Sequence, residues 1–179
     1  MKKRMSSSRK ALFVAESAAL LVAALALSYV ESLIPLSFVP LPGFKLGLAN
    51  IVTVIVFFRL SPLAAALISI SRVVITSLLF TGVSSLMFAL SGAVLSFIIL
   101  IVLSFLLKDK ISFIGISVVM ALFHNAGQLI AASFLMKSAA VFTYFPALCL
   151  SSLICGCITG AILCAMPDAV TSGKDHTVL

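Results

Sequence analysis

The run Ser84-Ser-Leu-Met-Phe-Ala-Leu-Ser-Gly-Ala-Val-Leu-Ser-Phe-Ile-Ile-Leu-Ile-Val-Leu-Ser-Phe-Leu-Leu107 contains no charged residue, and Lys108-Asp109-Lys110 follows it directly. A helix needs about 20 apolar residues to cross the hydrocarbon core of a bilayer. The run therefore predicts a membrane-spanning helix that ends at a charged loop.

Five further apolar segments flank this run on both sides, and prolines or charged residues end most of them. They cover residues 11–34, 47–58, 62–80, 111–136 and 143–166, and the second is the shortest. We therefore expect an all-α, polytopic membrane protein with six transmembrane helices. The transmembrane domain would cover residues 11–166, between a basic N-terminus (1–10) and a tail (167–179), both cytoplasmic.

The composition of the chain excludes two broad classes of protein. Hydrophobic residues make up 63% and charged residues 9% of the 179 residues, and the mean hydropathy is +1.32. A soluble enzyme has far more charge, and a disordered chain has low hydrophobicity. The net charge of +7 comes mostly from residues beside apolar segments, which indicates membrane topology and no nucleic-acid partner.

The distribution of Lys and Arg predicts the orientation. Basic residues precede the first span (Lys2, Lys3, Arg4, Arg9 and Lys10), follow the second (Arg59) and follow the fourth (Lys108 and Lys110). Only Lys45 and Lys137 fall on the opposite side. Cytoplasmic loops carry the excess of basic residues, so we expect both termini in the cytoplasm.

One cation and one polar group of three residues interrupt the apolar pattern at mid-span. Arg72 lies about ten residues from either end of its span, where an Arg costs about 2.5–3.5 kcal/mol on insertion scales. It must pair or face water, and its candidate partners are Glu31, Glu16 or a bound anion. The structural alternative is an ion pair between helices.

The polar group on the fifth span is His124-Asn125-Ala-Gly127-Gln128. His124 and Gln128 share one helix face, and Asn125 lies on the neighbouring stripe. These side chains suit a ligand with carbonyl, hydroxyl or phosphate groups, or they hydrogen-bond to neighbouring helices. They make a poor metal site, and we expect neither a metal nor a cofactor.

The segment after the first span is apolar yet irregular, because Pro35, Pro40 and Pro42 cannot belong to a helix. With Gly43 it predicts either a lid folded over the bundle or a plain connector. Lys45 follows, where a cation opposes the dipole of the next helix. Glu31 or an anionic ligand would compensate this charge, or Lys45 extends to the headgroups.

These polar residues together predict one ligand pocket open to the outside and roofed by the proline loop. Glu31, Lys45, Asn50 and Tyr144 are expected at the outer surface, and Arg72 and the His124 group at the centre. The predicted ligand-binding residues are Glu31, Lys45, Asn50, Arg72, His124, Asn125, Gln128 and Tyr144.

Two ridges of small residues favour close helix contacts. One comprises Ala15, Ala19 and Ala23, and the other comprises Ser152, Gly156, Gly160 and Cys164. One ridge would serve internal packing, which leaves the other for a partner helix. We interpret Cys149, Cys155, Cys157 and Cys164 as packing residues.

No catalytic motif accompanies these features. The chain has no Gly-rich phosphate loop followed by Lys and Ser or Thr, and Asp109, Asp168 and Asp175 are isolated. Magnesium-diphosphate chemistry needs grouped carboxylates. We therefore expect a binding subunit and no enzyme.

The string Lys45-Leu-Gly-Leu-Ala-Asn50, together with Glu31, Arg72, His124-Asn125-Ala-Gly127-Gln128 and Tyr144-Phe-Pro146, resembles the family called heptaprenyl diphosphate synthase component I, or Gx transporter. The resemblance covers roughly residues 11–166. That family is similar in architecture to bacterial S components of energy-coupling-factor (ECF) transporters, which bind a vitamin or a related small molecule from outside.

The resemblance implies a location in the bacterial plasma membrane and docking on a T component with two ATPases, which Ala15, Ala19 and Ala23 would contact. It also implies a small ligand that resembles a vitamin, a quinone or an isoprenoid precursor. The alternative is a non-catalytic membrane accessory in heptaprenyl diphosphate synthesis, with a soluble prenyl synthase as partner.

Overall fold

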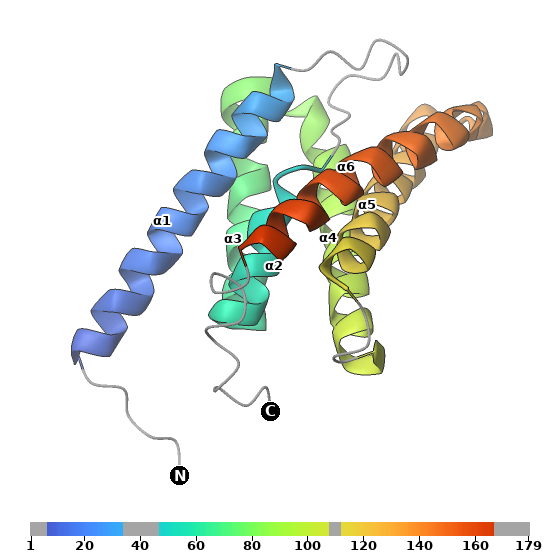
Figure 1. Cartoon of the computed structure of the whole chain (residues 1–179). Coiled ribbons are helices and arrows are strands. Elements are labelled where there is room, and N and C mark those ends of the chain that lie inside the picture. The colour runs from blue at the N-terminus through green and yellow to red at the C-terminus, as the bar shows by residue number, and fades with distance from the viewer. Residues whose placement is uncertain (1–6, 34–46, 108–111, 167–179) are drawn as a thin grey trace.

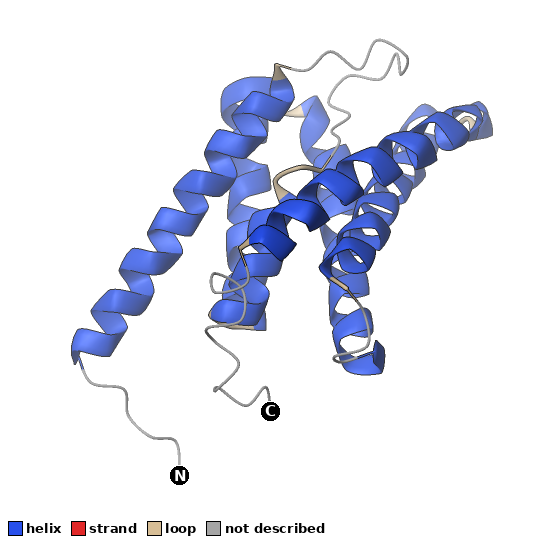
Figure 2. Cartoon of the chain, viewed as in Figure 1, coloured by secondary structure: helices blue, strands red, loops and turns tan. Residues whose placement is uncertain are grey.

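The computed structural model describes residues 7–33, 47–107 and 112–166, and this part of the chain is helical throughout, without strands (Figures 1 and 2). The elements are α1 (Ser7–Ser32), α2 (Asn50–Arg59), α3 (Pro62–Thr76), the π-helix η1 (Ser77–Thr81), α4 (Ser84–Leu107), α5 (Phe113–Met136), the 3-10 helix η3 (Ala139–Tyr144) and α6 (Phe145–Ala165). The all-α prediction is confirmed.

Five helical segments of the described chain are long and apolar enough to cross a membrane. The exception is α2, which has 10 residues and so extends only about 15 Å at about 1.5 Å per residue. A bilayer core is about 30 Å thick. The expected second span is therefore present at its predicted place, but it reaches only halfway through the core.

The short helix α2 lies in the middle of the bundle. It packs against α1, α3, α4, α5 and α6, and its residues from Asn50 to Phe57 are all buried. The largest hydrophobic cluster of the described residues forms around it, with Leu100, Met120 and Leu163 from the surrounding helices. Complete burial explains why a helix too short to span the membrane still has an apolar sequence.

The helix α1 is attached to the bundle along a single stripe. Within the described residues it packs against α2, α3 and η1 and has no contact with α4, α5 or α6, and Figure 1 shows it along one side of the molecule. Its buried residues are Ala24, Ser28 and Glu31, which recur at helical spacing. The rest of α1 is largely exposed.

Glycines allow α4, α5 and α6 to pack closely as consecutive neighbours. A Cβ atom at Gly127 of α5 would lie 2.7 Å from the carbonyl oxygen of Ser91 in α4, and one at Gly156 of α6 would lie 2.4 Å from the Cα atom of Val118 in α5. Gly160 approaches the Cα atom of Ile114 equally closely. The ridge predicted on the last span therefore serves internal packing.

Candidate functional site: a buried polar cluster around Arg72

Arg72 of α3 joins three helices at one buried point. Its side chain is 2% exposed. Nη1 donates to Oγ of Ser28 in α1 at 3.1 Å, and Nη2 donates to Oδ1 of Asn50 in α2 at 3.4 Å. The negative charge of Glu31 also acts on the guanidinium. Of the two carboxylates considered as partners of Arg72, Glu31 is the one whose charge acts on it, and a direct pairing stays a prediction.

Glu31 is also tied to the start of α2. Its Oε1 accepts hydrogen bonds from the backbone N–H groups of Gly47 and of Leu48, the second at 3.3 Å. These groups lie just before the N-terminus of α2, where the helix dipole favours a negative charge. The carboxylate of Glu31 thus faces two positive partners, the guanidinium of Arg72 and the start of a helix.

The cluster lies about halfway along the segment formed by α3 and η1, at the start of α2. Asn50 comes nine residues before Arg59, and Arg72 comes ten residues after Pro62, so both lie about 15 Å from the turn that joins α2 to α3. The short α2 begins level with Arg72, as the hydrogen bond between Arg72 and Asn50 shows. The expected place of Glu31 and Asn50 at the outer surface stays a prediction.

His124 and Gln128 of α5 form the second part of the cluster. Their Nε2 atoms lie 3.1 Å apart, as expected for polar side chains one turn apart on a helix. A Cβ atom at Gly47 would lie 3.5 Å from Cδ2 of His124 and 3.0 Å from Nδ2 of Asn50. Gly47 therefore lies between the imidazole ring and the Asn50–Arg72 group.

The opposite edge of the imidazole faces α4. A Cβ atom at Gly92 would lie 3.0 Å from Cε1 of His124 and 3.0 Å from Cγ of Gln128. Two glycines, Gly47 and Gly92, thus leave the space that the ring of His124 occupies. A Cβ atom at Gly92 would crowd the ring, whereas one at Gly47 would crowd the side chain of Asn50 and only touch the ring.

Three side chains of the cluster carry atoms that have no hydrogen-bond partner among the described residues. These atoms are Nδ2 of Asn50, Nε of Arg72 and Oε1 of Gln128. All three side chains are at least nine-tenths buried. Because a buried polar atom without a partner costs about 1–3 kcal/mol, the arrangement is expensive unless another molecule supplies the missing partners.

Asn125 is directed to a different place. Its Nδ2 donates to Oγ of Ser152 at 2.8 Å and to the carbonyl oxygen of Leu148 at 3.3 Å, both in α6. Of the two alternatives for this residue, the structure supports the hydrogen bond between helices. Its predicted role in ligand binding has no support from these contacts and stays a prediction.

The remaining predicted residues lie apart from the cluster or outside the described residues. Tyr144 packs against a separate hydrophobic cluster that includes Phe88, Leu129 and Val141. Lys45 and the lid residues Pro35, Pro40, Pro42 and Gly43 lie outside the described residues. Their predicted roles stay untested.

Glu16 forms its ion pair elsewhere. Its Oε1 accepts from Nε of Arg59 at the end of α2, about 22 Å along α1 from Glu31 at the rise of a helix. The suggestion that Glu16 is a partner of Arg72 is therefore wrong. Residue spacing alone did not show which of the two carboxylates on the first span faces Arg72.

Sequence reasoning missed four residues of this region: Ser28, Gly47, Gly92 and Ser152. Ser28 could have been found, because it precedes Glu31 by three residues on the same helix face. Gly47 and Gly92 act by having no side chain, and a single glycine in a membrane helix is too common to indicate a site. Only the tertiary contacts identify them.

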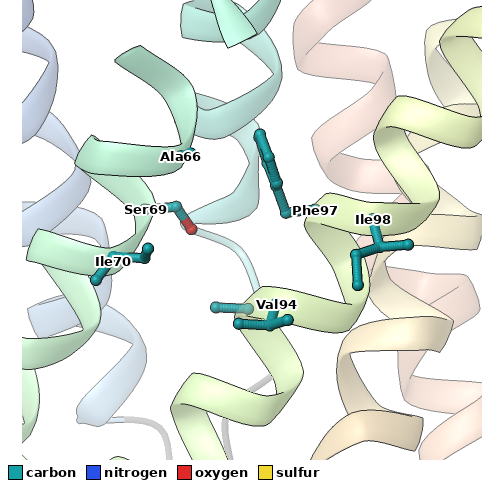
Figure 3. Close-up of a pocket in the computed structure, with 7 residues that line it drawn as sticks. Ala66, Ser69, Ile70, Val94, Phe97 and Ile98 are labelled. Carbon is teal, nitrogen blue, oxygen red and sulfur yellow. The ribbon is translucent and has the colours of Figure 1, made fainter. Parts of the chain in front are cut away.

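A separate apolar groove lies between α3 and α4 (Figure 3). It has a volume of about 70 Å³ and is lined by Ala66, Ser69, Ile70, Ala93, Val94, Phe97 and Ile98. Ile70, Val94 and Ile98 are exposed, so the groove opens on the outer face of these helices. It contains none of the predicted ligand-binding residues.

A model of the family described as heptaprenyl diphosphate synthase component I matches residues 20–166. The chain belongs to this family. The matched range includes every residue of the polar cluster, and the resemblance drawn from the sequence motifs is confirmed. Among curated proteins and among solved structures, no match to the chain was found. Family membership and the long apolar helices identify a multi-pass membrane protein.

Proposed function

We propose that this protein is the substrate-binding subunit of an ECF-type transporter, with an S-component-like role. It would bind a small vitamin-, quinone- or isoprenoid-precursor-like molecule in the plasma membrane of a bacterium, with both termini in the cytoplasm. The main support is the buried polar cluster, in which Nε of Arg72, Nδ2 of Asn50 and Oε1 of Gln128 have no hydrogen-bond partner among the described residues.

A purely structural role explains this cluster less well. Polar side chains that only join helices would be expected to satisfy one another, because there is no water in the bilayer core to do so. Asn125 and Ser152 do form such a bond across α5 and α6. Oδ1 of Asn125 nevertheless has no partner among the described residues. The Arg72 cluster gathers three such atoms, on Arg72, Asn50 and Gln128, and one molecule bound there would satisfy them.

The exposed ridge on α1 supports a partner subunit. Ala15, Ala19 and Ala23 are all exposed, on the side of α1 away from the buried Ala24 and Ser28. The other small-residue ridge is already used against α5, so the α1 ridge is free for close approach of another helix. In this proposal a T component docks here and two ATPases supply the energy, and the chain has no catalytic activity of its own.

The second candidate is a non-catalytic accessory of heptaprenyl diphosphate synthesis. The family description supports it, because a component I implies association with a partner component of the synthase. The two candidates differ in the partner that they require. Recovery of a T component and ATPases after gentle purification favours transport, whereas recovery of a soluble prenyl synthase favours the accessory role.

Ligand extraction tests the proposed binding function directly. The protein is purified gently from its native membrane, and native mass spectrometry with extraction identifies any bound small molecule. We expect one compound at near-equal stoichiometry that is lost from Arg72→Ala and His124→Ala. The matched control is Cys157→Ala, on the exposed face of α6. A compound that both cluster variants retain while folded would contradict the proposal.

A further inference from the structure

We propose that the head group bound in the Arg72 cluster is electrically neutral, with oxygen acceptors such as carbonyl groups, and that it is not a phosphate, diphosphate or carboxylate. This inference rests on the proposed binding function and narrows its substrate class. The sequence pattern left both choices open, because Arg72 alone suits an anionic or an electron-rich group equally.

The first argument is the charge balance of the cluster. Among the described residues, Glu31 and Arg72 are the buried charged side chains, 3% and 2% exposed. Both bond to the start of α2, Arg72 to Asn50 and Glu31 to Gly47 and Leu48, so a positive and a negative charge lie together there and their sum is zero. A buried diphosphate would need several compensating cations, since an isolated charge in this environment is very costly.

The second argument concerns the start of α2. A helix N-terminus with free N–H groups is a ready anion site. Here the N–H groups of Gly47 and Leu48 already donate to the carboxylate of Glu31. Glu31 therefore occupies the position that an anionic ligand would take, and it faces both sources of positive potential that the described residues of the cluster supply.

The third argument is the chemistry of the atoms that remain. Nε of Arg72 and Nδ2 of Asn50 are donors without a partner, and Oε1 of Gln128 is an acceptor without one. Nε2 of His124 lies 3.1 Å from the amide nitrogen of Gln128. In this arrangement that nitrogen only donates, so Nε2 of His124 accepts from it. These groups match a head with carbonyl oxygens and one hydroxyl or N–H group.

Three probes with the same farnesyl chain test the inference, because the chain keeps each probe in the bilayer at the depth of the cluster. They are farnesol, a farnesyl-substituted benzoquinone and farnesyl diphosphate. Saturable binding to the full-length protein in lipid nanodiscs is measured by scintillation proximity. We expect at least one neutral probe to bind about tenfold more tightly than the diphosphate.

Glu31→Gln makes the test specific to charge. Glutamine keeps an acceptor oxygen for Gly47 and Leu48 but removes the negative charge beside Arg72, so we expect diphosphate affinity to rise about tenfold relative to the affinity for the neutral probe. Glu16→Gln is the matched control, because it removes a carboxylate from the same helix at the Arg59 ion pair.

The outcomes distinguish an error in the proposed head group from an error in the proposed binding function. If wild-type protein binds farnesyl diphosphate as tightly as the neutral probes, the neutral head group is wrong and the binding function stands. If Glu31→Gln and Glu16→Gln change diphosphate binding equally, the charge balance around Arg72 is not the cause. If folded protein binds none of the three probes, the inference fails, and the ligand extraction described above decides the binding function separately.

Discussion

Gly47 shows how much of the cluster depends on one small residue. Its φ is 85°, in the left-handed region that costs an L-residue about 1–2 kcal/mol. Its N–H group donates to Glu31, and the space above its Cα lies between Asn50 and His124. Only glycine provides the turn, the donor and the free space together.

Gly47→Ala should therefore lower the free energy of unfolding by about 2–3 kcal/mol, through backbone strain and displacement of Asn50. Gly82→Ala is the control, since Gly82 has the same φ of 85° but is exposed, and should cost only about 1–2 kcal/mol. Thermal unfolding in detergent compares them. Equal losses would show that crowding near His124 has no effect.

The Glu31–Arg72 pair allows a second prediction at this scale. Arg72→Ala leaves the buried carboxylate of Glu31 without its counter-charge and should destabilise the protein by about 3–5 kcal/mol. Adding Glu31→Ala should cost less than the sum of the two single variants. A double-mutant cycle on unfolding measures this coupling.

The Glu16–Arg59 pair is the control for that cycle. Its side chains are 34% and 37% exposed, so we expect a coupling of only about 0–1 kcal/mol. A buried pair that couples no more strongly than this half-exposed pair would contradict the electrostatic role given to Glu31.

Among the elements, α2 and the α5–α6 pair decide where the site can form. The half-length of α2 brings its first residue to the depth of Arg72, and the glycines of α6 hold α5 at backbone contact. His124 and Gln128 project from α5 toward α2 and α4. Packing with few polar residues therefore sets the positions of α2, α5 and α6.

Gly156→Leu should disrupt this packing, because even a Cβ atom at Gly156 would lie 2.4 Å from the Cα atom of Val118. Overpacking of this kind costs about 1–3 kcal/mol or more. Cys157→Leu, one position further and exposed, should leave the unfolding temperature nearly unchanged. A similar loss in both variants would show that added bulk on α6 destabilises the helix irrespective of α5.

For the whole molecule, the unusual feature is the exposure of α1. It is attached through Ala24, Ser28 and Glu31 and leaves its alanine ridge uncovered. Lipid covers exposed apolar residues in a membrane, so exposure alone says nothing of a partner. A ridge of small residues permits close approach of a second helix. This leads to a specific prediction for the alanine ridge of α1.

Ala19→Leu should leave the fold intact but reduce recovery of the partner subunit about tenfold or more, as loss of about 1.4 kcal/mol or more at the contact would do. Val14→Leu is the control, because Val14 is 65% exposed and lies about 100° around the helix from Ala15. Co-purification from native membranes measures recovery. Undiminished recovery with Ala19→Leu would place the partner on another surface.

The sequence alone determined the membrane class, the number and order of the helices, and the polar residues that matter most. Apolar runs predict helices in lipid because the backbone has no other way to satisfy its polar groups there. Arg72, His124 and Gln128 stood out for the same reason, since a polar side chain at mid-span is costly and visible in a single sequence.

Only the tertiary structure decided which of these residues meet and what they leave free. Glu31 rather than Glu16 faces Arg72, Asn125 turns to α6, and Gly47 and Gly92 make room for His124. Such contacts depend on helix length, rotation and close approach between segments far apart in the chain. A pattern of residue types reports polarity along each helix, but it carries no measure of distance between helices.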